Sequence, residues 1–357
     1  MSTIPQAPAL PATPRPIISI GAGGIVRDAH QPAYRGAHFP VHGVFDRHRG
    51  RAEALAADFG IGEVYDSLEA AVTAAPAGCV FDVAVPATAL VELIPQLPAG
   101  ANVLIQKPLG EDLEAAQQLR TICQDRRLNA AVNFQLRFAP FIIAARHLVD
   151  SGAIGRLHSL DLRVTVKTPW DLWPFLRGIP RLEILYHSIH YVDLVRHFMG
   201  EPQGVYARTT RHPAYPCLAA TRTGMIMDYG DEHTAAIVTT HGHDFGQRHQ
   251  ESYIRWEGTD GAIRAQMGVL MDYPAGADDV LEVCRGTGEG AQWEPIPLEG
   301  TWFPDAFLGT MASVMCHADD PETPLPTQVD DACETMAVVE AAYLSSASGA
   351  TAIPRDE

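Results

Sequence analysis

The chain is poor in cationic residues and has no hydrophobic run long enough to cross a membrane. It holds 26 Lys and Arg residues against 43 Asp and Glu residues, a formal net charge of −17. So few cations cannot neutralise a run of phosphates, which argues against nucleic acid and anionic membranes as partners. No segment reaches the roughly 20 apolar residues of a membrane span, and residues 1–16 lack the apolar core of a signal peptide. We therefore expect a cytoplasmic protein.

Cysteine pairs with the spacing of metal ligands are also missing. The six cysteines are scattered without a C-x-x-C pair, so reduced thiols are expected. At 357 residues and 46% hydrophobic, the chain is long enough for two domains. The sequence predicts a disordered, Pro-rich tail at 1–16, a nucleotide-binding domain at 17–136 and a second domain at 137–357.

The sequence does contain a dinucleotide-binding fingerprint near its start. An apolar strand at 17–20 leads into Gly21-Ala22-Gly23-Gly24-Ile25-Val26, and a second strand ends at Asp46. Gly21 permits the tight turn, Gly23 lets the backbone approach a pyrophosphate, and the start of the following helix favours that anion. The flanking strand and the spaced Asp make this the βαβ fingerprint of a Rossmann domain.

The residues after the second strand bear on the choice of cofactor. Asp46 can accept hydrogen bonds from both hydroxyls of an adenosine ribose and repels a 2′-phosphate. Arg47, directly after it, can pair with that phosphate. The sequence favours NAD, with NADP as the alternative.

Strands and helices alternate at short spacing through the first domain. After Asp46 we expect helices at 51–59, 89–97 and 111–126 and strands at 77–85, 101–106 and 130–134. This is the rhythm of a doubly wound parallel sheet. Beyond residue 137, a helix at 139–151 gives way to alternating strands separated by hairpin-type turns. The expected fold class is α/β, with an N-terminal Rossmann domain and a C-terminal α+β domain built on a mostly antiparallel open sheet.

Four segments together carry a family resemblance. They are Gly21-Ala22-Gly23-Gly24-Ile25-Val26, Ala29-His30-Gln31-Pro32-Ala33, Gln106-Lys107-Pro108-Leu109 and His190-Tyr191-Val192-Asp193-Leu194. The chain resembles the glucose-fructose oxidoreductase/inositol dehydrogenase/rhizopine catabolism family. The resemblance implies an NAD(P)-dependent oxidoreductase of sugars, cyclitols or related polyols, forming a homodimer or homotetramer through the C-terminal sheet. The cofactor-binding residues that we expect are Gly21, Gly23, Gly24, Ile25, Val26, Asp46, Arg47, Pro86, Gln106, Lys107, Pro108 and Asn133.

Two positions depart from the family pattern. The family commonly has Glu-Lys-Pro, and this chain has Gln106 before Lys107. The family commonly has Asp four residues before the catalytic His, and this chain has Tyr186 before His190. The second departure puts the usual Asp-His proton relay in doubt.

Hydride transfer from a carbinol needs a base near neutral pKa and a cation or donor for the developing oxyanion. Lys107 follows a parallel strand at the edge where ligands of open α/β sheets bind, and Pro108 restricts its backbone to extended geometry. We expect Lys107 to be catalytic. The alternative is a surface lysine at the end of a strand.

The segment 181–193 is the second candidate for catalysis. Glu183, Tyr186, His187 and His190 have helical spacing that predicts one shared face. We expect His190 to be the base and Glu183 to orient His187 at i+4, which compensates for the missing Asp. The alternative is a solvated helix face or histidines that bond backbone carbonyls.

No metal site is expected. His187 and His190 are not accompanied by further ligands at a familiar spacing. His241, His243 and His249 form a second apparent group, but chance clusters are expected in a chain with 15 histidines.

Substrate contacts are expected in the segment 167–175, where flat rings suit the C–H faces of a sugar. The same rings can instead pack the loop onto the core. Arg163 and Lys167 alternate on one strand and are expected to face the cleft. The substrate-binding candidates are Lys107, Arg163, Lys167, Trp170, Trp173, Tyr186 and His190. Two other functions remain open: a reductase of a non-sugar carbonyl or diol, and a non-catalytic regulator that binds NAD(P) and sugar.

Overall fold

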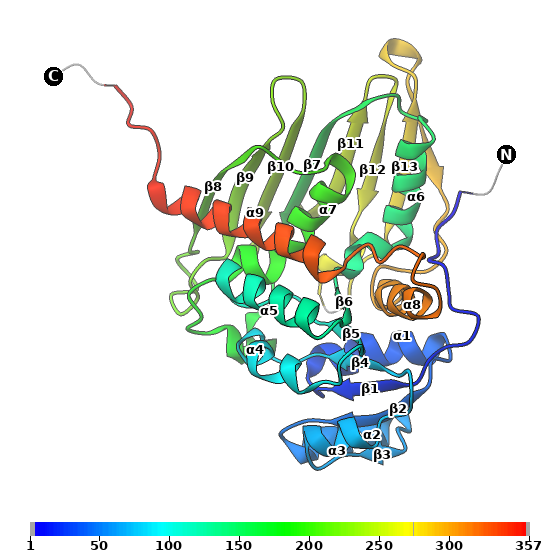
Figure 1. Ribbon diagram of the computed structural model, residues 1–357. Helices are drawn as coiled ribbons and strands as arrows, with labels where there is room; N and C mark the ends of the chain where they lie inside the picture. The colour runs from blue at the N-terminus through cyan, green and yellow to red at the C-terminus, as the bar shows by residue number, and fades with distance from the viewer. Residues whose placement is uncertain (1–3, 274, 355–357) are drawn as a thin grey trace. The chain divides into compact units, whose positions relative to one another are not determined.

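The computed structural model describes residues 4–273 and 275–354 and divides the chain into two compact units (Figure 1). Unit 1 comprises the residues up to 151 together with 296–336, and unit 2 comprises 152–295 and the residues from 337 onward. The first unit thus runs to residue 151, beyond the expected boundary at 136, and it also includes the late segment 296–336. Sequence patterns identify elements along the chain but not the return of a late segment to an earlier unit.

Unit 1 is built on sheet A, a six-stranded parallel sheet with the order β3-β2-β1-β4-β5-β6. Its strands are β1 (Ile17–Ile20), β2 (Val41–Phe45), β3 (Glu63–Val64), β4 (Val80–Val83), β5 (Asn102–Ile105) and β6 (Asn129–Val132). Every residue of β1, β4 and β5 is buried, as expected for parallel strands covered on both faces. This order is that of the doubly wound Rossmann sheet, so the α/β prediction is confirmed.

Helices cover both faces of sheet A (Figure 1). They are η1 (Val26–His30), α1 (Gln31–Gly36), α2 (Arg49–Phe59), α3 (Leu68–Thr73), η2 (Ala87–Ala89), α4 (Leu90–Leu93), η3 (Ile94–Gln96), α5 (Leu113–Asp125) and α8 (Ala306–Asp319). Two further helices of this unit, η4 (Gln135–Phe138) and α6 (Pro140–Asp150), follow β6. α1 and α8 pack into one buried cluster on the sheet, in which Phe307 and Met311 of α8 meet Val80 and Leu104. The late helix α8 is thus part of the first core.

The N-terminal segment is ordered by contacts with unit 1. Residues 4–16 contain no helix or strand. The Gln6 side-chain amide donates to the Pro297 carbonyl at 2.8 Å and accepts from the Glu299 N–H at 2.8 Å. Arg15 donates to the Asp319 carboxylate at 2.9 Å. The expectation of a disordered tail is wrong for these residues, because their polar groups find partners far along the chain.

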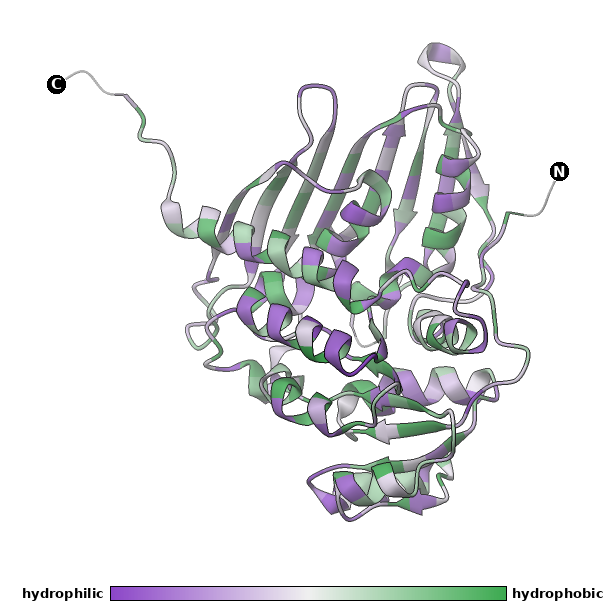
Figure 2. Ribbon diagram, viewed as in Figure 1, coloured by the Kyte–Doolittle hydropathy of each residue, from purple (hydrophilic) through white to green (hydrophobic). Residues whose placement is uncertain are grey.

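Unit 2 is built on sheet B, an eight-stranded sheet with the order β14-β13-β12-β11-β7-β10-β9-β8. Its strands are β7 (Leu157–Thr165), β8 (Gly204–Thr210), β9 (Arg222–Asp228), β10 (Thr234–Thr240), β11 (Glu251–Gly258), β12 (Gly261–Gln266), β13 (Val280–Arg285) and β14 (Gln292–Ile296). β7 and β10 pair in parallel, and the neighbouring pairs are antiparallel. Hydrophobic and hydrophilic residues alternate along these strands (Figure 2). The mostly antiparallel sheet is confirmed.

Among the helices of unit 2, α7 packs against β10 of sheet B. The helices of this unit are η5 (Trp170–Leu172), η6 (Pro174–Leu176), η7 (Ile184–Ser188), α7 (Ile189–Met199), η8 (Gly268–Leu270), η9 (Gly288–Gly290) and α9 (Val329–Ser348), of which α9 begins in unit 1. Within the described part of the chain, none of the helices combines the length and the apolar character needed to span a membrane.

Candidate functional site

The glycine turn after β1 has the geometry of a phosphate-binding turn. Gly21 has a φ of +108°, and a Cβ on it would lie 2.2 Å from the Ala84 carbonyl oxygen, so only glycine fits. A Cβ on Gly23 would meet nothing within 4 Å. The backbone at Gly23 is therefore open to a ligand, directly before the helix that continues into η1 and its N–H groups.

The Asp46 carboxylate is fixed beside this turn. Its Oδ2 accepts a hydrogen bond from the Ala22 N–H at 2.8 Å, and its Oδ1 accepts one from the His48 N–H at 2.7 Å. Arg47 between them is exposed. An open glycine turn with a preset carboxylate at the end of β2 fits the diphosphate and ribose of a dinucleotide.

The remaining cofactor candidates follow the strands of sheet A at the same, carboxyl edge. Pro86 follows β4, Gln106 to Pro108 follow β5, and Asn133 follows β6. Lys107 and Pro108 are joined by a cis peptide bond. Burial lowers the pKa of Lys107 to about 8. The structure thus brings these predicted residues together on one edge of unit 1.

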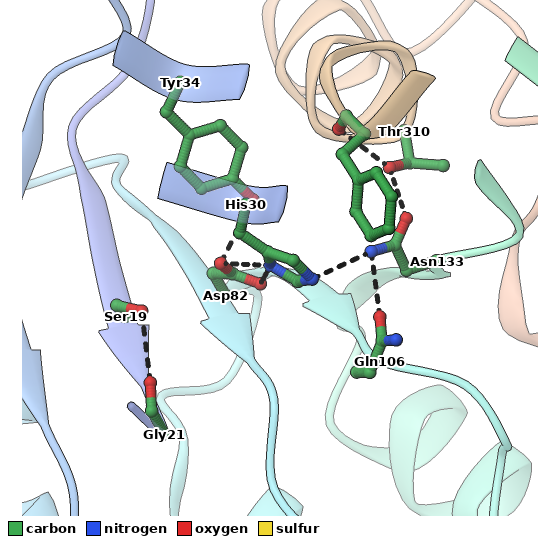
Figure 3. Close-up of polar contacts among 9 residues, drawn as sticks. Ser19, Gly21, His30, Tyr34, Asp82, Gln106, Asn133 and Thr310 are labelled. Atoms are coloured by element: carbon green, nitrogen blue, oxygen red, sulfur yellow. Dashed lines mark hydrogen bonds and ion pairs between the residues drawn. The ribbon is translucent and has the colours of Figure 1, made fainter. Parts of the chain in front are cut away.

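Gln106 is hydrogen-bonded to a buried network of polar side chains (Figure 3). The Asn133 side-chain Nδ2 donates to Gln106 Oε1 at 2.9 Å and lies 3.2 Å from His30 Nε2. Its Oδ1 accepts from the Thr310 hydroxyl at 2.7 Å. Asn133, predicted as a cofactor ligand, therefore holds the residue that precedes Lys107.

His30 anchors the network to the middle of sheet A. Its Nδ1 lies 2.9 Å from Asp82 Oδ2, and the Tyr34 hydroxyl donates to the same oxygen at 3.1 Å. His30 and Asp82 are fully buried. Because the Asn133 amide donates to Nε2, the network assigns the His30 proton to Nδ1. Sequence analysis missed this pair, although an Asp within a buried strand run was the available signal.

The predicted catalytic helix of unit 2 begins with a π-helical turn, η7, before α7. Tyr186, His187 and His190 are partly exposed, whereas Glu183 is 0% exposed. The expected single face is wrong for Glu183, because the wider π turn changes the angular spacing assumed for a regular helix.

The Glu183 carboxylate is satisfied by residues from several segments. Its oxygens accept from the Ser188 hydroxyl at 2.8 Å and from the Thr223 hydroxyl, and Oε1 lies 3.1 Å from His241 Nε2. Burial by itself raises the pKa of Glu183, but the bonds to His241, Thr223 and Ser188 outweigh it and hold that pKa below its ordinary value. The imidazole that the structure pairs with Glu183 is His241, where we expected His187.

The rings of unit 2 form a cluster around His241. The ring centroid of His187 lies 4.7 Å from that of His241, and Trp170 meets both rings edge-on at 5.3 and 5.6 Å. The Trp170 indole N–H is buried and has no hydrogen-bond partner among residues 4–273 and 275–354. His241 was dismissed at the sequence level as part of a chance cluster, since its partners lie far away in the sequence.

Two other substrate candidates, Lys167 and Trp173, contact residues of unit 2. Lys167 lies after β7, where its ammonium pairs with Asp244 at 2.6 Å, and the Trp173 ring lies 5.7 Å from that of Tyr273.

The expectation that Arg163 faces the site is wrong. Val164, its neighbour on β7, is in register with Thr239, which pairs with Thr223, the partner of Glu183. Alternation along the strand puts Arg163 on the opposite face of the sheet, where it pairs with Glu251 at 2.9 Å.

Metal ligands do not gather in this part of the structure. Within the described ranges, no group of three or more His, Cys, Asp or Glu side chains is arranged to hold a metal ion. The six cysteines are free thiols.

Two sequence profiles match successive parts of the chain. The profile of the oxidoreductase family with an NAD-binding Rossmann fold matches residues 17–134, and that of the GFO/IDH/MocA C-terminal domain matches residues 142–264. The chain belongs to the GFO/IDH/MocA oxidoreductase family. Unit 1 accordingly carries the NAD-binding Rossmann domain of this family.

Several relatives of this GFO/IDH/MocA oxidoreductase are named as sugar dehydrogenases. The chain is 23% identical over 335 residues to D-xylose 1-dehydrogenase (NADP(+)) 2 of Haloferax volcanii, covering 93% of this chain and 97% of the relative. It is 26% identical over 355 residues to D-apiose dehydrogenase of Paraburkholderia graminis, covering 93% and 88%. An Agrobacterium radiobacter oxidoreductase, solved with NAD+, L-tartaric acid and magnesium, superposes with a TM-score of 0.77 at 22% identity, covering 94% and 97%.

Proposed function

We propose that the protein is an NAD(P)-dependent dehydrogenase that interconverts a secondary alcohol and a carbonyl on a sugar, cyclitol or related polyol. The observation that carries this proposal is Lys107, a half-buried lysine with a pKa lowered to about 8, on the sheet edge that also bears the glycine turn and Asp46. A titratable cation beside a dinucleotide site is what alcohol oxidation requires.

The cofactor would be held by the carboxyl edge of sheet A. Backbone N–H groups after Gly23 bind the diphosphate, and Asp46 accepts from the ribose hydroxyls. When bound, the cofactor supplies the acceptor or donor of the hydride. The Asp46 carboxylate, already fixed by two backbone N–H groups, favours NAD over the 2′-phosphate of NADP.

Lys107 stabilises the oxygen that becomes negative as the hydride leaves the carbinol. Lys107 and Lys167 are the only lysines, and the other 24 of the 26 cationic side chains are arginines. An arginine stays protonated at any working pH, whereas a lysine with a pKa of about 8 can also give up a proton. Lysine at position 107 therefore suits proton exchange with the substrate hydroxyl.

In unit 2, His190 is the proposed base for the hydroxyl proton, with Tyr186 and His187 on the same partly exposed side of η7 and α7. Trp170 offers a buried indole N–H that lacks a partner in the described chain, and a substrate hydroxyl supplies one. Trp173 and Lys167 extend this surface with a flat ring and a cation. The named sugar dehydrogenases among the relatives support a hydroxylated substrate.

We also propose that the protein is a homodimer or homotetramer joined through sheet B. Tyr206, Ile226 and Val238 are exposed on β8, β9 and β10. Tyr206 is paired with Ile226, and Val238 lies two residues along β10 from Ala236, the partner of Ile226. Scattered apolar side chains are common on surfaces, but three adjacent ones on a sheet favour an interface. Light scattering of the wild type and of Ile226→Glu tests this assembly.

The test of the activity is a substrate panel. The purified protein is incubated with NAD+ or NADP+ and aldoses, cyclitols, alditols and non-sugar alcohols, and absorbance is followed at 340 nm. Turnover of a polyol or sugar that falls by a factor of roughly 10²–10³ in Lys107→Met, with cofactor affinity kept within a few-fold, is expected. Turnover of non-sugar alcohols alone would reassign the substrate. Cofactor binding without any turnover would favour a regulator.

A further inference from the structure

Glu183, at the start of η7, is a buried carboxylate that the packing of the fold does not require. Glu183 is 0% exposed, and replacing a buried ion by apolar residues often stabilises a fold. Here the ion is satisfied by Ser188, Thr223 and His241, and its lowered pKa keeps it charged. The cluster therefore maintains a permanent negative charge against one histidine.

That charge fixes the proton on His241. Because an ionised carboxylate only accepts, His241 Nε2 must carry the hydrogen that it shares with Glu183. In the neutral ring, Nδ1 is then an acceptor, and it lies 2.9 Å from the Thr168 hydroxyl. Glu183 thus determines which atom of His241 faces the loop.

The loop that carries Trp170 and Trp173 is hydrogen-bonded to His241 through Thr168. The Thr168 N–H donates to the His241 carbonyl at 3.2 Å, and the Trp170 N–H donates to the Thr168 carbonyl at 2.9 Å. The Trp170 ring packs on both His241 and His187. These contacts connect Glu183 through His241 and Thr168 to Trp170.

Other charged groups around Glu183 are accounted for. Burial, with the Glu183 charge as a further cause, raises the pKa of Tyr191 and of Tyr343, so both phenols are neutral. Arg181 stacks on the Tyr343 ring and pairs with the Glu340 carboxylate at 2.5 and 2.8 Å. The carboxylate of Glu183 is left to act on His241.

We propose that Glu183 and His241 are positioning residues that hold the Trp170 indole and the His187 ring in the arrangement that binds a hydroxylated substrate. This inference rests on the proposed dehydrogenase function, and it assigns His241 a role that the sequence did not suggest. Where the family commonly has an Asp at position 186, this chain has Tyr186. Here the buried carboxylate is Glu183, and its pairing with His241 orders the rings that bind the substrate.

The test follows the Trp170 indole directly. The chain has five tryptophans, so a ¹⁵N-tryptophan-labelled sample gives a small set of indole signals, and Trp170→Phe assigns the relevant one. We expect this signal to shift in Glu183→Gln, His241→Gln and Thr168→Val. The matched control is His243→Gln, two residues further along, whose ring is partly exposed and lies 3.1 Å from the Arg248 carbonyl oxygen. It should leave the signal in place.

The kinetic arm uses the best substrate of the panel. We expect the KM for that substrate to rise at least fivefold in Glu183→Gln and Thr168→Val, with the KM for the cofactor within twofold, and Thr168→Ser to restore it. An unchanged indole signal and an unchanged KM in Glu183→Gln, with only a lower Tm, would overturn the proposal. A shifted indole signal in a protein that oxidises nothing would support the positioning role and reject the dehydrogenase. Thr168→Val replaces a hydroxyl by a methyl group of similar size, so it keeps the test decisive if Glu183→Gln does not fold.

Discussion

The Asp46 carboxylate accepts a hydrogen bond from the backbone N–H of Ala22, 24 residues earlier, at a distance of 2.8 Å. This bond joins the end of β2 to the glycine turn, so the carboxylate is set in place before any ribose arrives. A group that needs no rearrangement loses less entropy on binding its ligand.

Cofactor preference should therefore depend on Asp46. In Asp46→Ala the preference for NAD+ over NADP+ should narrow by about 1–3 kcal/mol, the cost of losing charge-assisted hydrogen bonds to the ribose. Titration of both cofactors at physiological salt measures this. Arg47→Ala is the companion variant and should widen the preference. Tighter binding of NADP+ than of NAD+ by the wild type would show that Arg47 outweighs Asp46.

Alanine substitutions at two glycines of the same turn should have different effects, one on stability and the other on cofactor binding. Gly21→Ala places a Cβ 2.2 Å from the Ala84 carbonyl oxygen at a φ of +108°, so it should lower the Tm. Gly23→Ala has open space and should keep the Tm within a few degrees while weakening cofactor binding at least tenfold. Thermal melts and cofactor titrations separate the two. A Gly23→Ala variant with wild-type affinity would remove this turn from the cofactor site.

The pKa of Lys107 should be visible in the pH dependence of carbonyl reduction. Burial lowers the pKa to about 8, so the ammonium is present below that pH and lost above it. If the ammonium stabilises the oxyanion, the rate of reduction falls as the pH rises through about 8. Because Lys107 and Lys167 are the only lysines, reductive ¹³C-methylation gives two side-chain NMR signals that titrate separately. A Lys107 pKa near the ordinary value of about 10.4 would contradict this assignment.

Glu183 should support stability above its own titration and not below it. Its pKa is depressed in the folded state, so the unfolded chain binds more protons in acid and stability rises with pH there. The contribution is complete above the ordinary value of about 4.3 and is lost as the pH falls through the folded pKa. Glu183→Gln should flatten this acid side of the Tm profile. Glu294→Gln, at an exposed carboxylate paired with Arg285, serves as the control and should not flatten it.

The phenol at position 186 should be dispensable for proton transfer. A phenol has an ordinary pKa near 10 and adds little negative charge near neutral pH, so it cannot raise the basicity of His190 as an Asp would. We expect Tyr186→Phe to change kcat by no more than about twofold and His190→Ala to abolish turnover. Initial rates with the best substrate decide this. The opposite order would make Tyr186 the proton shuttle.

The parallel sheet was predictable because its signals are local. β1, β4 and β5 are continuous apolar runs, and the turn after β1 needs glycine at fixed spacing. The short strand β3 and the late strands β13 and β14 were missed. β3 has only two residues, and β14 is mostly exposed, so neither shows a clear period.

The residues of the candidate site were also predictable only where their signals are local in the sequence. Lys107 and the glycine turn sit at strand ends that the sequence reveals. The sequence does not reveal the partners of Glu183. His241 lies 58 residues later, and only the register of sheet B and the π turn bring the two together. Helical spacing alone placed Glu183 with His187, since a π turn leaves no clear mark in the residue pattern.

The position of α8 has a consequence for biosynthesis. A chain leaving the ribosome completes sheet A by residue 132, yet Phe307 and Met311 of α8, which cover Val80 and Leu104, emerge only after all strands of sheet B. Until then, apolar surface beside α1 has no cover, and a fragment ending near residue 151 would keep it exposed. Expression of the nucleotide-binding unit alone therefore requires residues 296–336 to be joined back to it.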